Sequence, residues 1–243
     1  MIRSGGNSRR EQTPITEMTT KIPSVSMQTS YLLLTLSAVL TAAFGAVRAQ
    51  PRISVRPDLN RSEALREWSL DGSGAWNIAD GKLVLGKAGT PSGPIRRPSA
   101  LAILNSEPFQ KVTLQVQVRS TAAPEVLRRD VILVFGYQSP SRFYYVHLSA
   151  VTDAVHNGIF LVADADRRRL DDGKGQAPLK DQNWHSVRLE RDGSNGRIEI
   201  YVDGAAEPIL TALDSTISTG RVGLGSFDDT GEFREIQITG SMK

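Results

Sequence analysis

The chain has 243 residues, and its 29 Lys and Arg against 26 Asp and Glu give a formal net charge of +3. It contains no cysteine, which excludes disulfides, thiolate metal sites and a cysteine nucleophile. With 40% hydrophobic and 23% charged residues, the composition is that of a globular protein.

The N-terminal region carries the clearest local signal. Residues 31–45 form an uncharged apolar run, which is too short for a typical membrane span and has the length of a signal-peptide core. Small or branched residues at Val47 and Ala49 predict cleavage before Gln50. We therefore expect a leader at residues 1–49, a secreted or periplasmic protein, and no stable membrane anchor after cleavage. An anchor that is never cut is the alternative.

The leader also accounts for the basic charge. Five of the 29 bases and two of the 26 acids lie in it, so the mature chain has 24 of each and a net charge of zero. Nucleic-acid binding needs a basic stripe, so we expect no nucleic-acid partner. Met18 and Met27 are alternative translation starts, because only Lys21 supplies a positive charge between Met18 and the apolar run.

The mature chain has the pattern of short strands separated by Gly, Asp and Asn turns. Residues 112–119 alternate strictly between apolar and polar side chains, which predicts a half-buried antiparallel strand. Residues 131–137 are apolar on both faces, which predicts a central strand. Further strands are expected at 75–78, 82–85, 142–149, 158–163, 184–191, 197–203, 221–227 and 233–239, long loops at 90–98, 151–157 and 171–182, and a short helix at 61–68.

Such a series of strands indicates a sandwich or a barrel. We expect an N-terminal extension at residues 50–67, followed by one all-β domain at 68–240. The predicted fold is a two-sheet antiparallel jelly-roll sandwich.

Several stretches resemble the concanavalin A-like lectin/glucanase superfamily. The paired strands that end in Tyr201-Val202-Asp203-Gly204 resemble those of laminin G-like domains and laminarinase-type glucanases, and residues 220–227 and 233–236 resemble their closing strands. The opening at 76–83 is similar to the first hairpin of the 3-keto-disaccharide hydrolase domain family. The resemblance covers about residues 68–240 and implies a jelly roll that binds or processes carbohydrate.

One departure from the superfamily is informative. Laminarinase-type glucanases resemble one another in a Glu-x-Asp-x-(x)-Glu strand, where two carboxylates act as nucleophile and acid. This chain has no such triplet, and residues 232–235 carry a different pattern. A retaining glucanase of that kind is therefore excluded.

The polar faces of two predicted strands offer a candidate sugar-binding surface. If the strands at 112–119 and 142–149 share a concave sheet, alternation places Gln117, Arg119 and Tyr145 on its floor. Planar polar groups and an aromatic face are the mixture that binds sugars. The alternative is a sheet face that is simply exposed to solvent.

Two histidines are candidates for catalysis. His147 and His156 lie at the two ends of one connection, which is long enough to bring their imidazoles together. With Asp153 or Asp164 nearby they would form a general acid/base pair or part of a metal site. We expect Arg119, Tyr145, His147 and His156 to line one concave surface, with Asn157 and Asp164 at its edge. The alternative is that His156 caps a loop and His147 forms a hydrogen bond within the sheet.

The turn at residues 228–232 is acidic. Clustered oxygen ligands suit Ca²⁺, and the resemblance allows a structural calcium at Asp228 and Asp229. A solvated acidic turn is the alternative, and no other cofactor is expected.

Three functions are compatible with these observations. The first is a secreted carbohydrate-binding module that lacks the laminarinase-type carboxylates and binds a polysaccharide or oligosaccharide. The second is a glycoside hydrolase or lyase that resembles the 3-keto-disaccharide hydrolases and acts through the region of His147 and His156. The third is a laminin G-like adhesion domain.

Overall fold

The computed structural model describes residues 51–242, which form β-strands and one short 3₁₀ helix. In the described part of the chain, no helix has the length and apolar character needed to cross a membrane. In chain order the elements are β1 (Arg52–Val55), η1 (Ser62–Glu67), β2 (Trp68–Gly72), β3 (Ala75–Ala79), β4 (Lys82–Lys87), β5 (Ala100–Leu104), β6 (Lys111–Ser120), β7 (Asp130–Ser139), β8 (Arg142–Ser149), β9 (Gly158–Ala163), β10 (Arg168–Arg169), β11 (His185–Asp192), β12 (Arg197–Val202), β13 (Leu210–Leu213), β14 (Arg221–Ser226) and β15 (Gly231–Ser241).

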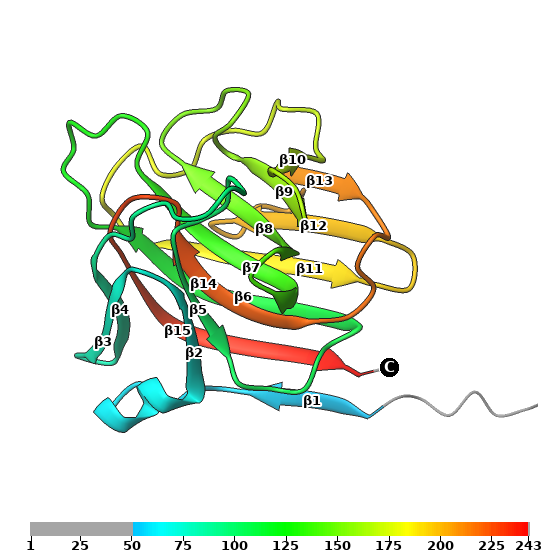
Figure 1. Cartoon of the computed structure of the whole chain (residues 1–243), viewed down its shortest axis with the longest axis horizontal. Coiled ribbons are helices and arrows are strands. Elements are labelled where there is room, and N and C mark those ends of the chain that lie inside the picture. The colour runs from blue at the N-terminus through cyan, green and yellow to red at the C-terminus, as the bar shows by residue number, and fades with distance from the viewer. Residues whose placement is uncertain (1–50, 243) are drawn as a thin grey trace, which may run out of the picture. The chain divides into compact units, whose positions relative to one another are not determined.

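The strands form two antiparallel sheets (Figure 1). One sheet has eight strands in the order β13-β12-β11-β6-β15-β4-β3, with β1 paired to β15. The other has seven strands in the order β10-β9-β8-β7-β14-β5-β2. The prediction of an all-β, two-sheet antiparallel jelly-roll sandwich is confirmed.

The core lies between the two sheets and follows the alternation of the strands. Val116 and Leu189 of the eight-stranded sheet belong to the same buried cluster as Leu133, Tyr144 and Leu224 of the seven-stranded sheet. The residues next to these in each strand point outward, because successive side chains of a strand alternate between the two faces of the sheet. The two outer faces differ, because only that of the eight-stranded sheet presents polar side chains such as Gln115 to solvent.

The outer face of the seven-stranded sheet is covered by a second apolar layer. Phe143, Tyr145 and Phe160 are buried there, and Ile95 of the loop 88–99 packs against them. We call this loop the strap. The strap explains why β8 is buried on both faces, although the sequence of β8 was expected to present one face to solvent.

The expectation that residues 112–119 and 142–149 share one sheet is wrong. Strand β6 lies in the eight-stranded sheet, between β11 and β15, whereas β8 lies in the seven-stranded sheet, between β7 and β9. The chain changes sheets in the connection between β6 and β7. Alternation predicts which residues share a face of one strand, but it does not predict to which sheet the strand belongs.

Strand β15 lies inside the eight-stranded sheet and has partners along both of its edges. It pairs with β6 along one edge, and along its other edge with β4 at residues 231–233 and with β1 at residues 238–241. Between these partners the register shifts and Glu235 adopts a positive φ of 52°. A bulge of this kind re-aims side chains and is common near binding sites.

Residues 50–67 were expected to precede the domain as an extension. In the structure β1 pairs with β15, and Leu59 and Ala64 are buried, so the eight-stranded sheet includes residues from Arg52 onward. Figure 1 shows β1, in blue, beside β15, in red.

Candidate functional site

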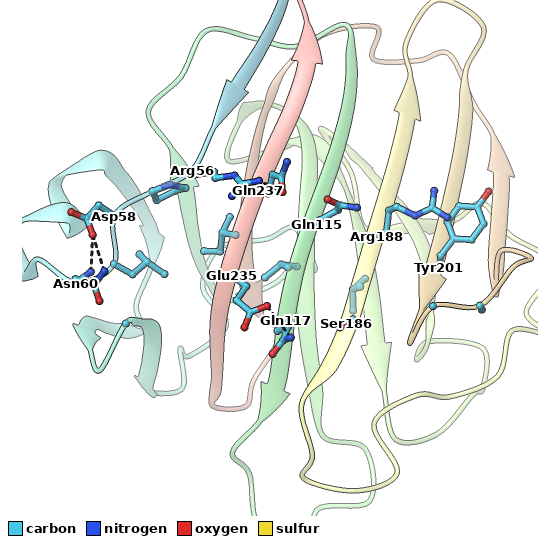
Figure 2. A pocket seen from close by; sticks show the side chains of 18 residues that line it. Arg56, Asp58, Asn60, Gln115, Gln117, Ser186, Arg188, Tyr201, Glu235 and Gln237 are labelled. Carbon is cyan, nitrogen blue, oxygen red and sulfur yellow. Dashed lines mark hydrogen bonds between the residues drawn. The ribbon is translucent and has the colours of Figure 1, made fainter.

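A polar groove crosses the outer face of the eight-stranded sheet. Direct strand pairing places Tyr201 beside Arg188, Arg188 beside Gln115, and Gln115 beside Gln237. Figure 2 shows these four side chains in one row across β12, β11, β6 and β15. Since neighbouring strands lie about 4.8 Å apart, the row is about 14 Å long.

Each end of this row is held by contacts. The Arg188 guanidinium lies 3.7 Å from the ring centre of Tyr201, a cation–π contact that fixes both side chains. At the other end Arg56 Nη2 donates a hydrogen bond of 2.9 Å to Gln237 Oε1. Gln115 lies between the two ends, is exposed and is free to face a ligand.

A second row lies two residues further along the same strands. Gln117 is paired with Ser186 on one side and with Arg234 on the other. Arg234 Nε donates to Gln117 Oε1 at 2.8 Å, and Gln117 Nε2 donates to Glu235 Oε2 at 3.0 Å. Gln117 is thereby oriented, and the carboxylate of Glu235 stays exposed at the bulge (Figure 2).

The segment after β1 closes one end of the groove. Asp58 accepts hydrogen bonds from the backbone and side chain of Asn60 and from Arg61. The Asn60 backbone N–H, with smaller contributions from the Asn60 side chain and Arg61, lowers the pKa of the Asp58 carboxyl. The groove has a volume of about 660 Å³, within the range of small-molecule sites.

Arg119 lies further along the same face and is engaged by other residues. It forms an ion pair with Glu232, which is also held by Lys82 at 3.0 Å. Its guanidinium lies 4.8 Å from the ring centre of Trp184, and that of Arg234 lies 4.2 Å from the same ring. Of the residues predicted for sugar binding, the structure therefore places Gln117 in the groove and Arg119 in an ion-paired cluster beyond it.

Tyr145, His147 and His156 belong to the other sheet. The expected convergence of Arg119 with these residues is wrong, because β6 and β8 lie in different sheets. The two histidines do come together, with ring centres 5.4 Å apart. Tyr145 and His147 are buried rather than exposed on a groove floor, and Tyr145 accepts a hydrogen bond of 3.0 Å from Arg167.

The other two residues predicted to bind the sugar, Asn157 and Asp164, lie at opposite ends of β9. Asn157 is fully buried beside His156, and its amide nitrogen donates to Thr152 Oγ1 and to the Gly175 carbonyl, both at 3.0 Å. Asp164 accepts a hydrogen bond from Ser141 at the other end of the strand. Asp164 is therefore separate from the histidines, because β9 runs between them.

The contacts of His156 also fit the alternative that this residue caps a loop. Its Nδ1 lies 2.8 Å from both carboxylate oxygens of Asp153. Burial opposes ionisation of Asp153, but hydrogen bonds from Val155 and His156 outweigh it and lower the pKa of Asp153 to about 2. This pair closes the loop between β8 and β9.

Asp228 and Asp229 lie in the turn between β14 and β15, and their carboxylates meet that of Asp130. Burial first, and then the neighbouring Asp130 and Asp228 carboxylates, raise the pKa of Asp229 to about 6. His147 Nε2 lies 3.2 Å from Asp130 Oδ2. The group offers three carboxylates, which are oxygen donors of the kind that calcium takes, and a calcium at Asp228 and Asp229 stays a prediction.

The sequence analysis missed several residues of the groove and of the acidic cluster. Arg188 and Tyr201 alternate with buried residues on their strands, so their outward direction was readable, but their alignment with Gln115 depends on the strand order. Gln237 and Glu235 depend on the bulge in β15. Asp130 gave no signal, because it only precedes the apolar run at 131–137.

No protein-family model matches the chain, and no curated protein matches it in sequence. Among solved structures, the carbohydrate-binding module CBM66 from Bacillus subtilis superposes with a TM-score of 0.51 at 16% identity, over 70% of this chain and 94% of that one. A mutant of the GH43 protein BlXynB from Bacillus licheniformis gives 0.50 at 11% identity, over 76% of this chain and 39% of that one. A lectin from Bauhinia forficata in complex with GalNAc gives 0.48 at 12% identity, over 79% of this chain and 99% of that one. The superposition on the carbohydrate-binding module shows that the chain has a concanavalin A-like β-sandwich fold.

Proposed function

We propose that the protein is a carbohydrate-binding module and that the groove on the eight-stranded sheet is its sugar site. The observation that carries the proposal is the row formed by Tyr201, Arg188, Gln115 and Gln237 across four strands. Amide groups are planar donors and acceptors, and guanidinium groups are planar donors, so both match pairs of sugar hydroxyls, and an aromatic ring packs on the apolar face of a sugar. The similarity to a carbohydrate-binding module and to a lectin supports the same class.

The carboxyl groups of Asp58 in the groove and of Glu232 in the cluster beyond it favour binding over glycoside cleavage. A catalytic acid needs a raised pKa, whereas the pKa of Asp58 is lowered by its hydrogen bonds. Glu232 is held by Lys82 and Arg119, and contacts with these two cations outweigh burial and lower its pKa as well. Neither carboxyl group is therefore prepared to donate a proton.

The test is a glycan array followed by calorimetric titration with the glycans that bind. We expect Gln115→Ala to weaken binding about tenfold, since a lost hydrogen-bonding partner costs about 1.4 kcal/mol. Tyr201→Ala should have an effect of similar size through loss of the aromatic surface. Gln176→Ala is the matched control, because Gln176 is also exposed but lies in a loop outside the groove.

Binding that is equal in Gln115→Ala, Tyr201→Ala and the control would place the sugar site elsewhere. Release of reducing sugar from a bound glycan would instead support a glycoside hydrolase or lyase. Absence of binding to any glycan, together with binding to a matrix protein, would support the adhesion-domain alternative.

We also propose that the protein is exported and that the mature chain begins at or near Gln50. The apolar run at 31–45 and the small residues at Val47 and Ala49 support this. N-terminal sequencing of protein recovered outside the cytoplasm should begin at or near Gln50. An exported chain that still begins at Met1, Met18 or Met27 would contradict cleavage.

A further inference from the structure

The bulge in β15 turns the side chain of Glu235 toward the groove. Two residues, Glu235 and Ile236, lie opposite the single Val116 of β6, because the register shifts between Arg234 and Gln237. Ile236 is buried in the core, and Glu235 lines the groove (Figure 2). Regular alternation after the outward Arg234 would have turned Glu235 inward. The extra residue is therefore what brings this carboxylate to the side of the sheet where a ligand binds.

The backbone of Glu235 has a conformation that its residue type disfavours. Five non-glycine residues within 51–242 have a positive φ, and the four besides Glu235 are Asp or Asn: Asp80, Asn157, Asp164 and Asp203. Short Asp and Asn side chains tolerate this region because they form local hydrogen bonds, whereas a Glu there is strained. Strain of this kind is found at ligand sites, so the side chain of Glu235 is a candidate for a role in binding.

The carboxylate of Glu235 is oriented from one side only. Arg234 Nε donates to Gln117 Oε1 at 2.8 Å, so the Gln117 amide presents its Nε2, which donates to Glu235 Oε2 at 3.0 Å. Within residues 51–242, Glu235 forms no ion pair, and its Oε1 accepts no hydrogen bond. An exposed carboxylate oxygen of this kind can accept hydrogen bonds from ligand hydroxyls, and such charge-assisted bonds are strong.

The charges of the groove lining balance. The lining contains two bases and two acids. One acid, Asp58, is ion-paired with Arg61 at 3.0 Å, whereas Glu235 is not ion-paired. Arg56, one of the bases, donates to Gln237. A groove without net charge, in which the unpaired acid faces the ligand, suits a neutral sugar and disfavours a sugar acid, because like charges brought together weaken binding.

We propose that Glu235 makes the groove selective for neutral glycans. Its carboxylate accepts hydrogen bonds from sugar hydroxyls, and it repels glycans whose units carry carboxylates. The inference rests on the proposed sugar site, since it names the class of glycan that this site takes. Glu235 is a binding and specificity-determining residue in this scheme, and Gln117 and Arg234 position it.

The experiment is calorimetric titration of the full chain with six hexasaccharides. Four are neutral, namely cellohexaose, mannohexaose, xylohexaose and laminarihexaose, and two are the β-1,4-linked hexaglucuronate and hexamannuronate. We expect the tightest binder to be neutral and both uronates to bind about tenfold more weakly. Glu235→Gln should weaken binding of that neutral glycan about tenfold without weakening binding of the uronates, so the preference should disappear.

Two further variants separate binding from structure. Glu125→Gln is the matched control, because it removes the same charge from an exposed residue of the loop between β6 and β7, outside the groove, and it should leave all six affinities unchanged. Glu235→Gly relieves the backbone strain and removes the carboxylate. It should bind the neutral glycan as weakly as Glu235→Gln does, with a melting temperature no lower than that of the unmodified protein.

The inference is overturned if a uronate binds as tightly as the best neutral glycan, or if none of the six binds. It is also overturned if Glu235→Gln, like Glu125→Gln, keeps the full affinity and the full preference. If Gln115→Ala weakens binding while Glu235→Gln does not, the sugar site stands and only the role of Glu235 is lost. A clear fall in the melting temperature of Glu235→Gly would assign Glu235 a structural role instead.

Discussion

The carboxyl group of Asp214 joins three separate parts of the sandwich. Its Oδ1 accepts hydrogen bonds from the Tyr144 hydroxyl at 2.5 Å and from the Thr216 backbone N–H at 2.9 Å, and its Oδ2 faces Arg168 Nη2 at 3.1 Å. Burial alone would raise the pKa of Asp214, but these partners outweigh it and lower the pKa to about 2. The hydroxyl of Tyr144 is affected in the opposite direction, since burial and then Asp214 raise its pKa to about 12.

This arrangement predicts a pH-dependent loss of stability in Asp214→Asn. A carboxyl group whose pKa is lower in the folded state stabilises the fold above its unfolded pKa of 3.8, and loses this effect as the pH falls toward 2. The variant should therefore be less stable by about 2 kcal/mol at pH 7 and similar to the unmodified protein near pH 2. Urea unfolding across this pH range measures the difference, and a difference that does not change with pH would contradict the assignment.

At the level of single residues, the sequence predicted on which face of its strand a side chain lies better than it predicted which residues contact that side chain. Gln117 was expected to point outward from its strand, and it does, because strict alternation fixes side-chain direction. Tyr145 and His147 were correctly placed opposite Val146, but were expected to be exposed. The layer that buries Tyr145 includes Ile95 of the strap, and His147 lies beside the rings of Phe160 and Phe227, so both are buried by residues distant in the chain, which no local pattern can indicate.

The strap is the element that distinguishes the two outer faces of the sandwich. Arg97 in the strap makes two hydrogen bonds of 2.7 Å to the two carboxylate oxygens of Asp71 in β2, and Tyr137 donates a third at 3.1 Å. Both charged side chains are only 14% exposed. The strap is therefore anchored by a nearly buried ion pair above the apolar layer of Phe143, Tyr145 and Phe160.

We expect Arg97→Leu to lower the free energy of unfolding by about 3 kcal/mol, because it leaves the Asp71 carboxylate buried without its partner. The double variant Asp71→Leu with Arg97→Leu should recover much of this loss, since no uncompensated charge remains. Chemical denaturation of both single variants and the double variant gives the coupling energy. Additive losses would show that the pair does not hold the strap.

Element boundaries followed from the sequence where alternation or turn residues were clear. The strand predicted at 158–163 matches β9, and that at 112–119 lies within β6. Five strands were missed, because all are short and β5 is apolar throughout, without a period: β1, β2, β5, β10 and β13. The groove could not be predicted at this scale, since it depends on β6 lying between β11 and β15.

At the scale of the whole molecule, one core joins the two sheets. Leu189 in the eight-stranded sheet and Leu224 in the seven-stranded sheet are both fully buried in the same cluster. Trp76 of β3 is buried in the same cluster, and its ring centre lies 6.0 Å from that of Phe233 in β15. The two sheets bury their inner faces against each other, so this core is shared, and the smaller apolar layer under the strap lies only on the outer face of the seven-stranded sheet.

We therefore propose that the sandwich unfolds as a single cooperative unit. Tryptophan fluorescence, which includes Trp76 in the core, and far-ultraviolet circular dichroism, which reports both sheets, should give coincident urea transitions. Leu189→Ala and Leu224→Ala should each lower the free energy of unfolding by about 3 kcal/mol and move both transitions together, although the two residues lie in different sheets. If Leu224→Ala shifted only part of the circular dichroism change and left the fluorescence transition in place, the sheets would unfold separately. In that case the shared core would not be the main source of stability.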